Sequence, residues 1–196
     1  MTDKKTFEIL DSLPPYGPMY TPVTEDGKPY YSEGFVVRFF KSNGENWVAN
    51  FKPGFKSFSN VFDFRDSENL IVIAGGLGYI MHPDNEKPIE VFGAAIDYAI
   101  GLNEEKIIAS DDTQVMEISP TGQQWISPRI AWDGIKEIRI ENGVLTGLSY
   151  DPMDDNNEWV PFSINLTTKQ IESGSYRRYY TDNGQPIEKR KWWKVW

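Results

Sequence analysis

Apolar and polar positions along this chain form short runs and not the longer periods of amphipathic helices. Between residues 35 and 176, β-branched and aromatic residues gather in runs of four to eight, and Asn, Asp and Gly separate the runs. Two runs around an Asn-Gly or Gly-Gly step are typical of a β-hairpin, because these residues tolerate the left-handed φ of a tight turn. We predict strands at residues 35–40, 47–51, 70–74, 78–81, 106–109, 114–118, 135–140, 144–150, 159–166 and 170–176.

Helical patterns are weak throughout the chain. The best candidates are residues 94–102 and a short segment over residues 5–12. In the first, Gly93, Gly101 and several β-branched residues oppose a helix. The sequence therefore predicts an all-β fold.

A weak internal repeat narrows the architecture. Apolar strands begin near Leu70, Ile107 and Leu145, so successive copies lie 37 and 38 residues apart. Propeller blades repeat every 40–50 residues or so, and this period is slightly shorter. We predict an antiparallel meander, propeller-like with few blades, and keep a β-sandwich as the alternative.

Breaker residues and charge divide the chain into three parts. Residues 1–34 are rich in Pro and Gly, which predicts an irregular N-terminal arm packed on the core. Residues 35–180 are expected to form a single β domain. Residues 181–196 form a basic, aromatic C-terminal tail.

Composition excludes several kinds of chemistry. The chain of 196 residues has no cysteine and one histidine, which rules out disulfides, cysteine nucleophiles and sites with several histidine ligands. It has 20 basic and 29 acidic residues, and its net charge of −9 opposes nucleic-acid binding and favours a basic protein partner. We expect no metal and no cofactor.

The sequence shows no signal peptide and no membrane span, so we expect a cytoplasmic protein.

Two acidic motifs invite a functional interpretation. Asp133, in the sequence Trp132-Asp133-Gly134, has no second catalytic group at a motif spacing, and we interpret it as a turn residue whose carboxylate accepts backbone N–H groups. The stretch 151–158 is rich in oxygen ligands but lacks the glycine of an EF-hand loop. We predict that Asp154, Asp155 and Glu158 instead bind a basic partner.

The tail concentrates aromatic residues on an otherwise acidic chain. We predict that Trp192, Trp193 and Trp196 dock on their own domain or on a second copy, which would form a homodimer. No residue pattern supports a catalytic assignment, and we expect a non-enzymatic binding protein. The alternative is a carbohydrate-active or small-molecule protein that uses paired carboxylates and tryptophans in a cleft, the candidates being Trp47, Trp125, Trp132 and Trp159.

Several stretches resemble an uncharacterised family of bacterial proteins common in the Bacteroidetes. They are SLPPYGPMY (residues 12–20), WVANFKPG (47–54), IAGG (73–76), WDG (132–134) and GSY (174–176). The resemblance spans most of residues 12–176 and implies a bacterial, β-rich protein with no assigned activity. With the acidic charge and the small size, we hypothesise an immunity-type inhibitor that neutralises a basic toxin.

Overall fold

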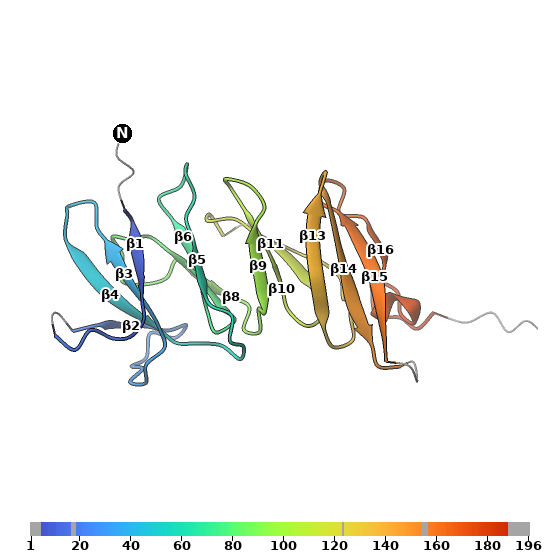
Figure 1. Cartoon of the computed structure of the whole chain (residues 1–196), viewed down its shortest axis with the longest axis horizontal. Coiled ribbons are helices and arrows are strands. Elements are labelled where there is room, and N and C mark those ends of the chain that lie inside the picture. Colours follow the sequence, from blue (N-terminus) through green and yellow to red (C-terminus); the bar gives the residue numbers. More distant parts are fainter. Residues whose placement is uncertain (1–4, 17–18, 123, 154–156, 188–196) are drawn as a thin grey trace, which may run out of the picture. The chain divides into compact units, whose positions relative to one another are not determined.

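The computed structural model describes residues 5–16, 19–122, 124–153 and 157–187. Within these residues the chain is all-β, as predicted, with four four-stranded sheets and one 3-10 turn (Figure 1). The chain forms two compact units. The first contains Met1–Asp111 and Met116–Trp125, and the second contains Asp112–Val115 and Ile126–Trp196. This division falls inside the range 35–180 that we expected to form one domain.

Each sheet is built mostly from strands that follow one another in the sequence. The first sheet has the order β1 (Phe7–Leu10), β3 (Phe35–Phe40), β4 (Asn46–Phe51), β2 (Thr21–Val23), and only the β2–β4 pair within it is parallel. The second comprises β5 (Asn60–Phe62), β6 (Leu70–Ala74), β7 (Leu77–Met81) and β8 (Glu90–Phe92). The third comprises β9 (Tyr98–Gly101), β10 (Ile107–Ser110), β11 (Val115–Ile118) and β12 (Gln124–Ile126). The fourth comprises β13 (Ile135–Glu141), β14 (Val144–Asp151), β15 (Glu158–Asn165) and β16 (Ile171–Ser173), and the 3-10 turn η1 (Tyr176–Arg178) follows it.

The β5–β8 sheet is the central layer of the first unit. Along β6, Leu70, Val72 and Ala74 belong to a core cluster shared with the first sheet. Ile71 and Ile73 belong to a second cluster shared with the β9–β12 sheet. Since successive side chains of a strand point to opposite faces, both faces of this sheet are buried, which explains why β6 is apolar throughout.

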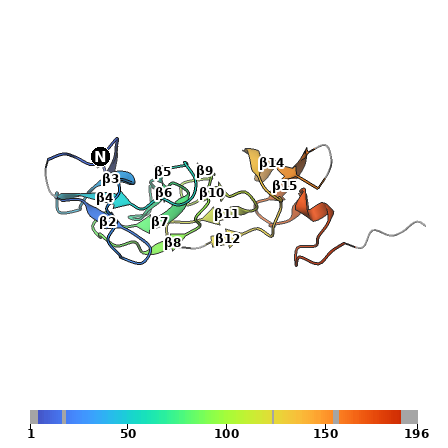
Figure 2. The ribbon, with the colours of Figure 1, turned by 90° about the horizontal axis from the view of Figure 1, so that it is seen from below.

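The sheets of the first unit stack in a row, as Figures 1 and 2 show from two directions. Two separate clusters join consecutive layers, so the stack is open and resembles a sandwich more than a closed propeller. The predicted repeat is nevertheless present. Leu70 and Ile107 begin β6 and β10, Leu145 is the second residue of β14, and each of these strands is the second of its sheet.

The N-terminal arm differs from our prediction because it contains two strands. β1 pairs with β3, with Phe7 opposite Phe39, and replaces the helix considered for residues 5–12. β2 lies at a sheet edge, where the missing N–H of Pro22 is tolerated. Asn50 also fixes the arm, since its side chain accepts a hydrogen bond from Gly34 N–H (2.8 Å) and donates one to Ser32 O (2.9 Å).

The other helical candidate, residues 94–102, contains strand β9. No helix among the described residues is long and apolar enough to cross a membrane.

Candidate functional site

One face of the β13–β16 sheet presents a row of polar side chains across all four strands, and all of them are exposed except the half-buried Ser163. Strand pairing places Arg139 opposite Thr146, Thr146 opposite Ser163, and Ser163 opposite Glu172. Residues directly opposite each other share a face of a sheet. We call this set the polar row, and the face that carries it the groove face.

Two further rows lie on the groove face, because side chains two positions apart along a strand point the same way. The next row contains Lys136, Leu148 and Pro161, and the last contains Tyr150 and Trp159. The rings of Tyr150 and Trp159 lie 5.3 Å apart, and Lys136 Nζ lies 3.8 Å from the centre of the Trp159 ring. The face therefore passes from hydroxyls and charges, through a middle row in which Leu148 and Pro161 are apolar, to an aromatic end.

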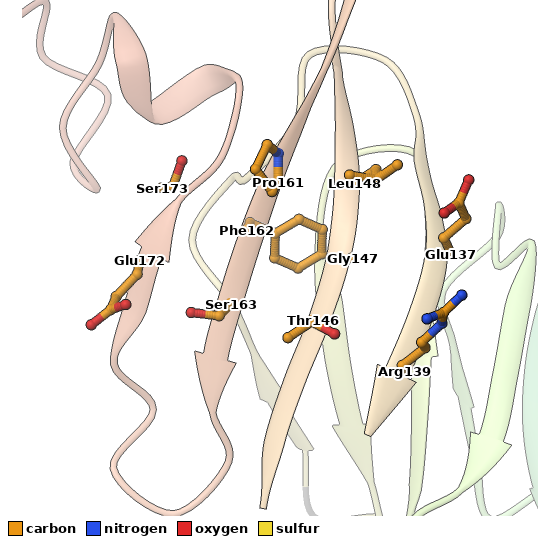
Figure 3. A pocket seen from close by; sticks show the side chains of 10 residues that line it. All are labelled: Glu137, Arg139, Thr146, Gly147, Leu148, Pro161, Phe162, Ser163, Glu172 and Ser173. Carbon is orange, nitrogen blue, oxygen red and sulfur yellow. The ribbon is translucent and has the colours of Figure 1, made fainter. Parts of the chain in front are cut away.

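A cavity of about 480 Å³ crosses this sheet. In Figure 3, Glu137 and Arg139 of β13 lie on one side of it and Glu172 of β16 lies on the other. Gly147 forms part of the lining, and a Cβ there would come within 2.8 Å of the Phe162 ring, so the close approach of this ring requires glycine. The full lining consists of Glu137, Arg139, Thr146, Gly147, Leu148, Pro161, Phe162, Ser163, Glu172 and Ser173.

A β-bulge in β13 brings Arg139 onto the groove face. The pairing with β14 shifts between Lys136 and Arg139, and Glu137 within the bulge has a φ of 55°. Without the extra residue, Ile138 would lie opposite Thr146, and Arg139 would point to the other face. The bulge therefore supplies the basic group of the polar row.

The acidic stretch 151–158 has a structural ion pair among its described residues. Arg178 Nη1 lies 2.8 Å from Glu158 Oε2 and 3.4 Å from Asp151 Oδ2, and Asp151 is fully buried. The hydrogen bond from Arg178 to Glu158 contributes most to raising the pKa of that guanidinium. Glu158 is thus engaged within its own unit, whereas Asp154 and Asp155 lie outside the described residues, as do Trp192, Trp193 and Trp196.

The Trp132-Asp133-Gly134 segment forms a turn, but not through its carboxylate. Gly134 N–H donates to Asp112 O (2.7 Å), and Gly134 O accepts from Tyr150 N–H (2.9 Å). Asp133 is exposed, and its carboxylate forms no hydrogen bond within the part of the chain that the structure describes. The turn is held by backbone contacts, so this part of our interpretation was wrong.

Ser175 joins this turn to the β13–β16 sheet. Its buried Oγ donates to Tyr150 O (2.6 Å) and accepts from Trp132 N–H (3.4 Å). Its N–H donates to Ser149 Oγ (2.8 Å), which in turn donates to Val160 O (2.9 Å). The WDG and GSY motifs, 40 residues apart in the chain, therefore meet at one buried hydroxyl.

The four tryptophans considered for carbohydrate binding have different surroundings. Trp47 is buried, and its Nε1 donates to Pro83 O (2.7 Å). Trp132 packs against Tyr176, with 4.9 Å between the rings, and Trp159 lies under Lys136. Trp125 lines a cavity of about 440 Å³ with Lys106, Glu117 and Gln124, where one carboxylate is present instead of a pair.

Acidic charge is concentrated in the first unit. That unit has 18 acidic and 10 basic residues, whereas the second has 11 acidic and 10 basic residues. The excess negative charge therefore lies outside the unit that carries the 151–158 stretch. No group of three or more His, Asp or Glu side chains suited to a metal ion occurs among the described residues.

No protein-family model matches this chain, and no curated protein matches it. The function is therefore inferred from the chain's own geometry. Our sequence analysis did not single out the groove face, although the spacing of Thr146, Leu148 and Tyr150 along one strand is a readable signal.

Proposed function

We propose that this protein acts by binding a second protein on the groove face. The observation that supports the proposal is the order of the three rows on one open sheet. Protein interfaces combine an apolar centre with a polar rim, and Leu148 and Pro161 lie between the polar row and the aromatic end. Arg, Tyr and Trp, which often dominate binding energies, are all present as Arg139, Tyr150 and Trp159.

The partner in this proposal is a basic protein. A net charge of −9 attracts cationic proteins over distances longer than direct contact and speeds their encounter. Neutralisation of a basic toxin by an immunity-type inhibitor is the most specific form of the proposal. We place this activity in the bacterial cytoplasm, and the resemblance to the Bacteroidetes family supports a bacterial source.

A pull-down with a variant of the groove face tests the proposal. Thr146 is exposed in the polar row, so Thr146→Arg inserts a bulky charge there without disturbing the core. Thr167→Arg makes the same change at an exposed position in the turn after β15 and serves as the matched control. Tagged wild type and both variants are incubated with a lysate of the source organism, and the retained proteins are identified by mass spectrometry.

We expect wild type and Thr167→Arg to retain the same basic protein and Thr146→Arg to lose it. Binding of the purified partner should then weaken at least tenfold with Thr146→Arg, while the thermal unfolding midpoint stays unchanged. Equal retention by both variants would show that binding does not use the groove face.

A further inference from the structure

We propose that two copies of this chain pair through their groove faces and form a symmetric dimer. The dimer can be tested without any partner, whereas competition between the second copy and a partner for this face rests on the proposed function. Three observations support the dimer: the order of charges in the polar row, the exposure of the two end charges, and the match of the rows across a two-fold axis.

The polar row has opposite charges at its two ends. Arg139 lies on edge strand β13 and Glu172 on the opposite edge strand β16. Thr146 and Ser163 lie between them, as Figure 3 shows. Three spacings of about 4.8 Å separate the two edge strands of this four-stranded sheet, or about 14 Å in all. This distance is too long for Arg139 and Glu172 of one chain to form an ion pair with each other.

Both end charges are open to another molecule. Arg139 and Glu172 are exposed, and neither forms an ion pair with any other residue that the structure describes. Lys136, the other basic residue of the three rows, already lies over the Trp159 ring. A guanidinium and a carboxylate can form two parallel hydrogen bonds, which makes their pairing strong and directional. The two ends of the row are therefore complementary to each other in different copies.

A two-fold axis makes the groove face complementary to itself. We consider two sheets stacked face to face about an axis that is parallel to the strands and midway between β14 and β15. In this arrangement β13 of each copy faces β16 of the other, and β14 faces β15. The rotation keeps the order of the rows along the strands, so each row meets its own counterpart. Arg139 of one copy then lies opposite Glu172 of the second copy, and this contact occurs at both ends of the row.

The other positions match under the same rotation. Hydroxyl, apolar and aromatic side chains each meet their own kind: Thr146 with Ser163, Leu148 with Pro161, and Tyr150 with Trp159. Strand β16 ends at Ser173, so no residue of this strand lies opposite Lys136. Glu137 lies level with Leu148 in Figure 3, away from the end of the polar row, where Glu172 of the second copy would lie.

The groove face is small for a permanent dimer. Its three rows lie about 7 Å apart along four strands, and a standard stable interface buries roughly 800 Å² on each partner. Face-to-face stacking is also how the sheets of the first unit cover one another. We therefore expect a stacked dimer that dissociates on dilution.

Charge reversal tests this dimer. Arg139→Glu places like charges opposite Glu172 of the second copy, and Glu172→Arg does the same opposite Arg139. Each substitution acts at both ends of the interface because the dimer is symmetric. Lys87→Glu, at an exposed position of the first unit, changes the net charge as Arg139→Glu does and is the matched control. Sedimentation velocity measures the dimer fraction of each protein over a hundredfold range of protein concentration.

We expect wild type and Lys87→Glu to dimerise alike and each groove-face reversal to raise the dissociation constant at least about tenfold. An equimolar mixture of Arg139→Glu and Glu172→Arg should dimerise again, because both ends of the mixed pair regain opposite charges. A wild type that stays monomeric over the whole range would overturn the proposal. So would reversals without effect, or a mixture no more dimeric than its two components.

These outcomes are independent of the pull-down. A dimer that follows the charge exchange, with equal partner retention by Thr146→Arg and Thr167→Arg, would leave the dimer valid and reject partner binding on this face. A monomeric wild type, with partner binding lost in Thr146→Arg, would do the reverse.

Discussion

The backbone N–H of Gly54 donates a 3.0 Å hydrogen bond to the carbonyl oxygen of Ala74. This bond joins the chain leaving β4 to the tight turn between β6 and β7. A Cβ on Gly54 would overlap the carbonyl oxygen of Ala94 and lie 2.9 Å from that of Gly75. Three backbone segments converge here, and they approach one another as closely as glycine allows.

Gly54→Ala should therefore destabilise the first unit by about 2 kcal/mol, because backbone atoms cannot move aside as flexible side chains do. Urea unfolding followed by tryptophan fluorescence measures the change. Gly101→Ala is the control, since a Cβ at that exposed strand position meets nothing within 4 Å, and we expect a change within about 0.5 kcal/mol. Equal midpoints for both variants would contradict the close approach.

Ser175→Ala should destabilise the second unit by about 1–3 kcal/mol, because Tyr150 O and Trp132 N–H both lose a buried partner. Urea unfolding is again the measurement. Thr167→Ala, an exposed hydroxyl removed from the same unit, should have little effect. If the two variants unfold alike, the serine hydroxyl does not hold the turn against the sheet.

Tyr79 should make stability fall at high pH. Burial, with smaller contributions from Glu25 and Tyr30, raises the pKa of its phenol well above the usual value. The folded state thus keeps Tyr79 protonated while the unfolded chain ionises above about pH 10. Its contribution to stability is complete below that pH and is lost above it.

Measured at pH 8 and pH 10.5, the free energy of unfolding should fall further for wild type than for Tyr79→Phe. The variant also loses the 2.7 Å hydrogen bond from the phenol to Lys52 O, which lowers its stability at both pH values. Only the difference between wild type and variant in the pH dependence of the unfolding free energy reports the titration of Tyr79. Equal pH dependence in both proteins would refute it.

The rate constants of partner binding should distinguish the contribution of the contact surface from that of long-range charge attraction. Thr146→Arg should increase the dissociation rate of the purified partner, because it disturbs the contact surface. The acidic first unit exposes three carboxylates on its loops, those of Asp66, Glu104 and Glu105. Neutralising them should lower the association rate about two- to tenfold and make it depend less on salt concentration. Surface plasmon resonance at several salt concentrations distinguishes the two effects, and a change in dissociation alone for the triple variant would contradict charge steering.

The sequence was most informative for strands in the interior of the sheets. The predicted segments 35–40 and 70–74 coincide with β3 and β6, and the other eight predicted strands overlap β4, β7, β10, β11 and β13–β16. The six strands that were missed, β1, β2, β5, β8, β9 and β12, all lie at sheet edges. They have three or four residues each, and such short, partly exposed segments contain too few apolar positions to produce a pattern.

The groove face was predictable only in part. The polar and apolar alternation of β14 can be read from the sequence, but the position of Arg139 depends on the bulge at Glu137. Nothing in the local pattern marks that bulge, because Glu137 is a non-glycine residue with positive φ. Pairing with β14 decides which way Arg139 points.

The same bulge also affects the tendency of this protein to aggregate through its sheet edges. Edge strands expose unpaired backbone groups that can recruit another chain and start aggregation. Among the edge strands of the described residues, seven have only three or four residues, and the exception is β13, with seven. The bulge interrupts that long edge between Lys136 and Arg139. The irregularity that supplies the basic group of the polar row thus also protects the chain from joining its neighbours into a continuous sheet.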